Sequence, residues 1–330
     1  MKRVQEKVIL FAAVIAFATA GTVFASGAQA TNEKEAEKIE IGAILLDTKQ
    51  EWFAEIIEGM KKAETDLNAK VRIFSSDSDV AKESSTIDNL IAQKVDAISI
   101  SPQSDEASVP AFERAVDAGI PVVTWNSKVN SPKSKYFVGV NNYDLGKGTG
   151  AFAVDYIKSK MGGKAKIAVL GISKYAVGID RVKGFLDQIK TLPGVEIVAQ
   201  QDAEFKEIGL SVTENIMQAH PDTQIIWCWN QGALLGALAA LKENPNNKVL
   251  LMGTDMSIDL ARAMLEPNSF LLAVTTQQPF EIGYASIKAA YELATTGNTQ
   301  NEVLVPLKTY TLNNKAEIQK YMDDRKDLIK

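Results

Sequence analysis

The chain has very little of the chemistry that metal sites and covalent catalysis usually need. Its 330 residues include one cysteine, Cys228, and one histidine, His220. A single cysteine excludes an internal disulfide, and the apolar run around Cys228 favours a buried, inert thiol over a nucleophile. A His/Cys metal cluster is all but excluded, and a His-containing catalytic triad would have to use His220, whose place before Pro221 favours a cap or a turn. We therefore expect neither an enzyme nor a metal site.

Sites for nucleotides and nucleic acids also lack support. No Walker A motif occurs, and the net charge of −5 argues against a nucleic-acid partner. Gly146, Gly148 and Ala151 match the dinucleotide fingerprint G-x-G-x-x-A, but a cap at 142–144 predicts that they lie inside a helix. There Gly146 and Gly150 would permit close helix packing. We expect no cofactor.

Only one apolar run is long enough to suggest a targeting segment, and it begins at the N-terminus. Lys2, Arg3 and Lys7 precede an apolar run over 8–24, which small residues follow. This is typical of a secretory signal peptide over 1–30, and the run is short for a membrane anchor of ~20 residues. We expect a periplasmic protein without a lipid anchor, because the signal has no cysteine.

The rest of the chain alternates apolar runs typical of buried strands with helical patterns. The first half contains predicted strands at 41–46, 70–74, 97–101, 121–125 and 136–140 and helices at 52–67, 81–93 and 108–118. The second half repeats this with strands at 166–170, 196–200, 224–228 and 248–252 and helices at 178–191, 208–219 and 233–243. A strand at 271–276, a helix at 280–296 and a segment at 303–310 would complete one domain and then the other. Such alternation predicts an α/β fold of two doubly wound, parallel-sheet, Rossmann-like lobes.

Aromatic residues follow the first predicted strand, where an open α/β sheet binds ligands. Trp52 and Phe53 lie at this junction of strand and helix. For Phe53, stacking on a ligand and forming the helix's apolar face are equally open, whereas Trp52 lies off the apolar stripe and favours a ligand contact. Trp125 and Trp229 alternate with polar neighbours and are predicted to pack into sheet faces.

A series of motifs supports a family resemblance by its order and spacing. The motifs lie at 50–53 (QEWF), 119–127 (GIPVVTWNS), 180–185 (DRVKGF), 203–210 (AEFKEIGL), 229–241 (WNQGALLGALAAL), 252–255 (MGTD) and 275–283 (TTQQPFEIG). Over nearly the whole mature chain the sequence resembles the exported sugar-binding proteins of ABC transporters, of the ribose-binding type. The resemblance implies a ligand cleft between two lobes joined by three hinge strands, which cross near Val140, Gln277 and Pro306. It implies lobes of 31–140 plus 278–306 and of 141–277 plus 307–330.

The resemblance also implies a set of ligand-binding residues, carried over position by position. They are Gln50, Trp52, Phe53, Asn126, Ser127, Arg181, Phe205, Asn230, Asp255 and Gln277. Aromatic faces suit the C–H side of a sugar ring, and amides and carboxylates bond neighbouring hydroxyls in pairs. Truncating Trp52 or Asp255 is therefore expected to weaken ligand binding while the fold stays intact.

Several of these residues also have a structural interpretation. Asn126 and Asn230 are equally suited to cap the helices that follow them. Asp255 is placed to cap a helix beginning near Ser257, although a ligand contact is favoured. Gln277 is suited to bond backbone at a hinge.

The sequence departs from the family at two places. Ile179 stands where many sugar binders have an arginine, and Arg181 either replaces it or braces the hinge. Asn126 and Ser127 stand where ribose binders use an acid and an arginine. Both changes lower the charge of the cleft and suit a pentitol, another pentose, a deoxy sugar or a furanose-like signal compound.

The implied function is capture of a small neutral sugar or polyol and its delivery to an inner-membrane ABC permease. We expect a monomer. The alternative is a sensory binding protein that presents its ligand to a receptor kinase or chemoreceptor.

Overall fold

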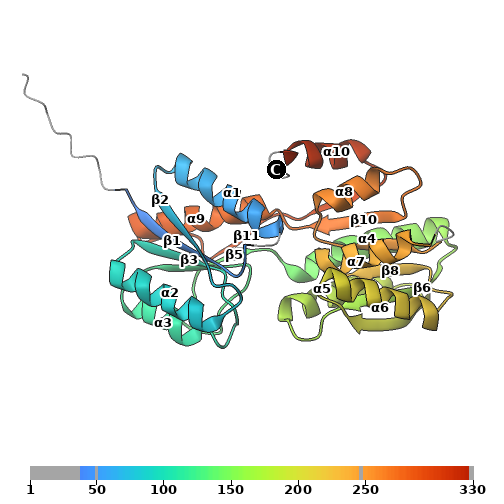
Figure 1. Cartoon of the computed structure of the whole chain (residues 1–330), viewed down its shortest axis with the longest axis horizontal. Helices are drawn as coiled ribbons and strands as arrows, with labels where there is room; N and C mark the ends of the chain where they lie inside the picture. Colours follow the sequence, from blue (N-terminus) through green and yellow to red (C-terminus); the bar gives the residue numbers. More distant parts are fainter. Residues whose placement is uncertain (1–37, 49–50, 245–247, 327–330) are drawn as a thin grey trace, which may run out of the picture. The chain divides into compact units, whose positions relative to one another are not determined.

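The protein has two α/β lobes, as the sequence predicts. The computed structural model describes residues 38–48, 51–244 and 248–326, and from Lys38 on the chain forms one compact unit. This unit contains two six-stranded sheets, sheet A and sheet B, covered by helices (Figure 1). The predicted signal peptide and Gln50 lie outside the described residues. In the described ranges, no helix is both long and apolar enough to cross a membrane.

Lobe 1 is built on sheet A. Its elements are β1 (Glu40–Leu45), α1 (Glu51–Asp66), β2 (Lys70–Ser75), α2 (Val80–Gln93), β3 (Ala97–Ile100), α3 (Val109–Asp117), β4 (Val122–Trp125), β5 (Phe137–Gly139), α9 (Pro279–Thr296) and β11 (Glu302–Leu304). The strands are all parallel, in the order β11-β5-β4-β3-β1-β2. The helices α1 and α9 cover one face and α2 and α3 the other, each pair with its own apolar core (Figure 1).

Lobe 2 is built on sheet B. Its elements are α4 (Asn142–Lys160), β6 (Lys164–Gly171), α5 (Ala176–Ile189), β7 (Gly194–Asp202), α6 (Lys206–Ala219), β8 (Ile225–Cys228), α7 (Gln231–Lys242), β9 (Leu250–Thr254), α8 (Ile258–Leu265), β10 (Leu271–Thr276), β12 (Lys308–Thr311) and α10 (Lys315–Asp323). The order β12-β10-β9-β8-β6-β7 repeats that of sheet A, so β9 corresponds to β4 and β6 to β1. One difference is that β12 runs antiparallel to β10, whereas β11 runs parallel to β5.

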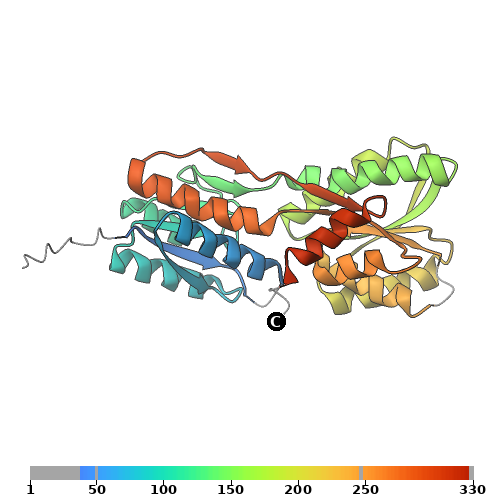
Figure 2. The same cartoon turned by 90° about the horizontal axis from the view of Figure 1, so that it is seen from above.

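The chain passes between the two sheets after β5, after β10 and after β11, and these passages can be followed in Figure 2. The passages bond to one another. The Val305 amide donates to the Gly139 carbonyl oxygen at 2.7 Å, and the Gln278 side chain donates to the Pro306 carbonyl oxygen at 2.7 Å. The segment predicted at 303–310 is therefore two strands in different sheets, and Pro306, which has no N–H to donate, separates them.

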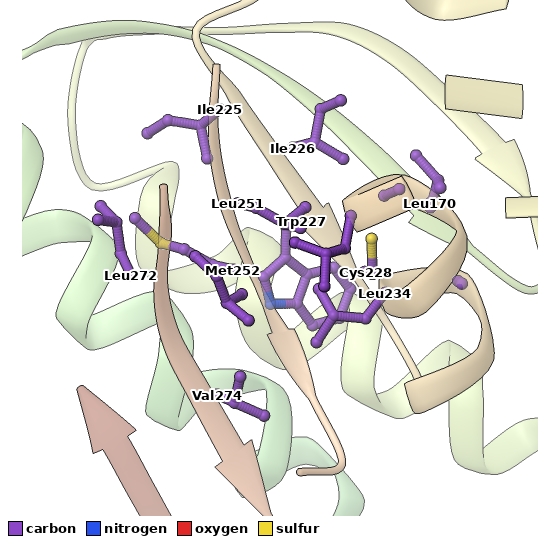
Figure 3. Close-up of a cluster of buried hydrophobic side chains, with 14 of the residues drawn as sticks. Leu170, Ile225, Ile226, Trp227, Cys228, Leu234, Leu251, Met252, Leu272 and Val274 are labelled. Atoms are coloured by element: carbon purple, nitrogen blue, oxygen red, sulfur yellow. The ribbon is translucent and has the colours of Figure 1, made fainter. Parts of the chain in front are cut away.

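The core of lobe 2 contains the single cysteine. Figure 3 shows Cys228 and Trp227 of β8 among apolar side chains from neighbouring strands. The Trp227 ring stacks on Phe185 at 4.5 Å between centroids, and its Nε1 donates to Thr149 Oγ1 at 2.8 Å. Cys228 is fully buried, and burial raises the pKa of its thiol far above the usual range. The predicted buried thiol is confirmed.

The glycines that resemble a dinucleotide fingerprint permit close packing of α4 on its neighbours. Gly146 and Gly148 lie within α4, as predicted, and not in a loop. A Cβ atom at Gly146 would lie 1.8 Å from the Arg181 carbonyl oxygen, so only glycine permits this approach. Gly146 and Gly150 therefore bring α4 against α5, whereas Gly148 faces Thr275 of β10 and Thr309 of β12.

Helix α10 is absent from the sequence-based expectations. It has two buried residues, Ile318 and Tyr321, on an otherwise polar helix. So weak an apolar stripe gives little helical signal.

Candidate functional site

A cavity of about 380 Å³ brings together most of the residues that the sequence analysis selected. It lies at the carboxyl ends of strands in both sheets. We call it the aromatic cavity, after four rings in its lining. Its lining residues are Leu46, Trp52, Phe53, Asn126, Val177, Arg181, Glu204, Phe205, Lys206, Glu207, Trp229, Asn230, Gln231, Gly232, Leu235, Asp255 and Gln277.

The rings contributed by lobe 1 are fixed by their packing. Trp52 and Phe53 lie in the first turn of α1, with their rings edge to face at 4.9 Å between centroids. Trp52 also stacks on the buried Trp125 at 6.4 Å. Phe53 is buried in the core, so it both starts the helix's apolar face and lines the cavity. Trp52 is only partly buried, which leaves part of its ring available to a ligand.

Lobe 2 contributes one exposed ring and one fixed ring. Phe205 immediately precedes α6 and is 55% exposed. Trp229 follows β8, and its Nε1 donates to the Ala203 carbonyl oxygen at 2.6 Å. The Arg181 guanidinium lies 5.6 Å from the Trp229 ring centroid. Trp229, predicted to pack into a sheet face, is buried in the core of lobe 2, and it also lines the cavity just beyond the strand end.

The buried charges of the cavity form an ion pair. Arg181 Nη1 donates to Asp255 Oδ2 at 2.7 Å, and Gln277 Nε2 donates to Asp255 Oδ1 at 2.9 Å. All three residues are at most 7% exposed. Arg181 Nε further donates to Asn142 Oδ1 at 2.9 Å. The pairing neutralises both charges and holds three side chains in one arrangement.

Asp255 does not cap a helix. Ser257 is the N-cap of α8 and accepts from the Leu260 amide. Asp255 instead has a left-handed backbone, with φ of 65°, directly after β9. Asn126 has φ of 64° directly after β4, the corresponding strand of lobe 1. Left-handed residues other than glycine are uncommon and gather at functional sites, so each lobe presents a polar side chain at the same place in its sheet.

The two asparagines differ in their roles. Asn230 caps α7 by accepting from the Ala233 amide at 2.9 Å, and its Nδ2 donates to the Glu204 carbonyl oxygen. The capping interpretation therefore holds for Asn230. Asn126 caps no helix. Its Nδ2 donates to Ser101 Oγ at 3.2 Å, and no residue in the described ranges donates to its amide oxygen, which is open to a ligand.

Ser127 and Ile179 lie elsewhere. Ser127 lines a second cavity, of about 620 Å³, which shares Asn126 and Val177 with the aromatic cavity. Ile179, where the family resemblance implies an arginine, is 47% exposed. In the described ranges no group of His, Cys, Asp and Glu is placed to hold a metal ion. We assign the site to the smaller cavity because it combines aromatic rings with buried, oriented polar groups.

Comparison with known proteins identifies the family. Residues 41–299 match the periplasmic binding protein domain. The chain belongs to the periplasmic binding protein family. Among its relatives, the ABC transporter periplasmic-binding protein YphF of Escherichia coli (strain K12) is 33% identical over 84% of this chain and 88% of the relative. The ribose import binding protein of Bacillus subtilis (strain 168) is 30% identical over 86% of this chain and 91% of the relative.

Solved structures of periplasmic binding proteins share the fold. A periplasmic solute binding protein from Actinobacillus succinogenes 130z with bound D-allose has a TM-score of 0.78 at 23% identity, over 86% of this chain and all of that one. A carbohydrate transporter solute binding protein from Agrobacterium radiobacter in complex with D-arabinose has a TM-score of 0.76 at 23% identity, over 88% of this chain and 99% of that one. The predicted family and two-lobed fold are confirmed.

Proposed function

We propose that this periplasmic binding protein captures a small neutral sugar or polyol and delivers it to an ABC permease. The observation that carries the proposal is the lining of the aromatic cavity. Rings from both lobes accompany uncharged amides, and the buried charges, Arg181 and Asp255, neutralise each other. The other charged lining residues are not buried: Lys206 and Glu207 are exposed, and the half-buried Glu204 pairs with Lys174. Such a lining suits a ligand with apolar C–H faces and hydroxyl edges, and offers no unbalanced buried charge to an ionic one.

The polar groups define how hydroxyls would be bound. Asp255 has lone pairs beyond those used by Arg181 and Gln277, so it can still accept from a ligand hydroxyl. The Asn126 amide oxygen provides an acceptor from the opposite lobe. Trp52 and Phe205 would cover the ring faces. A site that pairs buried polar groups in this way rejects analogues lacking a hydroxyl, because the groups would then be left unpaired.

The two lobes give the protein a way to report occupancy. A ligand that touches Trp52 and Asn126 in lobe 1 and Phe205 and Asp255 in lobe 2 binds most tightly when the lobes approach, so it shifts the population toward a closed form. The three passages between the sheets would act as the hinge. We propose that the closed form is what the permease recognises, that the chain acts as an exported monomer, and that it catalyses no reaction. The ABC import names of the relatives support this role.

The test is a thermal-shift screen of the mature protein. The panel is D-ribose, D-allose, D-arabinose, ribitol and 2-deoxy-D-ribose, with leucine and D-ribose 5-phosphate as controls. A ligand at 100 times its Kd adds about 2.7 kcal/mol to the free energy of unfolding. This raises the Tm by roughly several degrees. A shift with a neutral sugar or polyol supports the proposal. A shift with leucine or the phosphorylated sugar alone contradicts it.

A further inference from the structure

The C-terminal helix α10 connects the two lobes. It packs on lobe 2, where Ile318 and Tyr321 belong to the core and the Tyr321 ring meets Tyr310 edge to face at 5.4 Å. Beyond its last turn the chain reaches lobe 1, where Arg325 Nη2 lies 2.8 Å from a carboxylate oxygen of Glu55 on α1. The helix is therefore anchored in one lobe and bonded to the other.

The bonded groups form one buried cluster. The Tyr321 hydroxyl lies 3.2 Å from Glu55 Oε1 and 3.2 Å from the Met256 carbonyl oxygen. The Arg325 guanidinium lies 3.8 Å from the Tyr321 ring centroid and donates to the Tyr321 carbonyl oxygen. The side chains of Glu55 and Arg325 are 4% and 18% exposed. Two charges as buried as these stabilise each other only while their geometry is good, and separating them leaves both buried without a partner. The Glu55–Arg325 pair therefore resists displacement of one lobe against the other.

The cluster joins the two elements that carry the proposed ligand contacts. Glu55 follows Trp52 by three residues, so both project from the first turn and a half of α1. Met256 is the neighbour of Asp255, which begins the loop after β9. One hydroxyl thus contacts the backbone beside Asp255 and the helix that carries Trp52. These contacts of the Tyr321 hydroxyl are not needed to hold α10 on lobe 2. The burial of Ile318 and the contact of the Tyr321 ring with Tyr310 already do so.

We propose that Tyr321 and Arg325 are positioning residues that set the separation of Trp52 and Asp255 across the aromatic cavity. Neither of them is among the residues that line that cavity. This inference rests on the proposed function for its effect on affinity, but its effect on the separation of the lobes does not require a ligand.

The experiment first measures the lobes without ligand. Asn89 on α2 and Asn215 on α6 are exposed, one in each lobe, and Cys228 is fully buried, so Asn89→Cys with Asn215→Cys admits two spin labels. Double electron–electron resonance spectroscopy then gives the distribution of distances between the two spin labels. It is measured in the labelled parent, and then with Tyr321→Phe, Arg325→Gln or Lys320→Gln added. Lys320→Gln is the matched control, because Lys320 on α10 pairs with Asp324, the residue that follows this helix, at an exposed site.

We expect Tyr321→Phe and Arg325→Gln to shift or broaden the distribution, and Lys320→Gln to leave it unchanged. Calorimetry with D-ribose, D-allose, D-arabinose, ribitol and 2-deoxy-D-ribose should then give a roughly tenfold higher Kd in both variants, the usual size of coupling between separate sites. Arg325→Lys should recover part of the affinity. Thermal unfolding checks that each variant is folded, and Tyr321→Phe, which loses one oxygen atom, keeps the test available if Arg325→Gln unfolds.

Two results would overturn the inference: label distributions that match the parent in both variants, or an affinity in Tyr321→Phe equal to or tighter than that of the parent. If the parent binds none of the five compounds, the proposed function fails for this panel, while the ligand-free distances still decide whether the cluster positions the lobes.

Discussion

Replacing Asp255 by alanine should destabilise the fold as well as the site. Asp255 holds Arg181 at 2.7 Å and Gln277 at 2.9 Å, and Arg181 is only 5% exposed. Removing one partner of a buried ion pair costs about 3–5 kcal/mol, because the other charge stays buried without compensation. Since this pair lines a cavity that water can enter, we take the lower value of about 3 kcal/mol. The expectation from sequence that truncation of Asp255 leaves the fold intact is therefore revised.

The assay is thermal unfolding of the ligand-free protein, followed by circular dichroism. About 3 kcal/mol corresponds to a Tm lower by roughly 10 °C for a domain of 150–250 residues. The double variant Asp255→Ala with Arg181→Met should recover most of this loss, because no charge is then left buried. As a control, Asp88→Ala breaks the exposed pair of Asp88 with Arg114 and should cost no more than about 1 kcal/mol. An unchanged Tm in Asp255→Ala would refute the reasoning.

Three further changes have separate expected outcomes. Gly146→Ala should lower stability by about 1–3 kcal/mol in chemical denaturation, because its Cβ would overlap the Arg181 carbonyl oxygen, whereas Lys158→Ala on the exposed face of α4 should be neutral. Burial raises the pKa of Glu83 above 4.5, so the folded state keeps this proton to higher pH than the unfolded state, and stability falls as pH rises through the raised pKa. Glu83→Gln removes this loss, so the Tm of the variant relative to wild type should be more favourable at pH 7 than at pH 4. An equal difference in Tm at both pH values would count against this. Phe205→Ala should leave the Tm unchanged because the ring is 55% exposed, yet raise the Kd for the sugar several-fold in calorimetry, because a stacked ring is worth about 0.5–1.5 kcal/mol.

The sequence predicts the architecture well because its signals are local. Alternating apolar runs and helical patterns locate the elements of both sheets, and the glycines of α4 identify a close helix contact. The split of 303–310 into β11 and β12 is not visible, since a continuous extended pattern does not reveal a change of sheet. The sequence does not predict helix α10, because only Ile318 and Tyr321 mark its buried face.

The candidate site is predictable in its members and not in their roles. The motifs around Trp52, Asn126, Phe205 and Asp255 lie at strand ends, and the structure brings all four to one cavity. Their individual states depend on tertiary structure. The left-handed backbone of Asn126 and Asp255 follows from the geometry of two corresponding strand ends in different sheets.

The remaining site contacts depend on residues far apart in the chain. The pairing of Arg181 with Asp255 joins α5 to a loop 74 positions away. Trp229 was assigned to a sheet face because alternation of polar and apolar residues continues past the end of β8. The sequence did contain a signal that Trp229 lines the site. Parallel strands end in ligand-facing loops, and Trp229 directly follows the predicted strand 224–228.

The most direct measurement is hydrogen exchange of the protein with and without the sugar that gives a thermal shift. If a sugar binds in the aromatic cavity and joins the lobes, protection should increase together in two sets of segments: 51–56 and 125–127 in lobe 1, and 203–207 and 253–257 in lobe 2. Exchange in α2 and α3, which lie on the far face of sheet A from α1, should change little. Protection confined to one lobe, or protection that appears away from all four segments, would contradict the account.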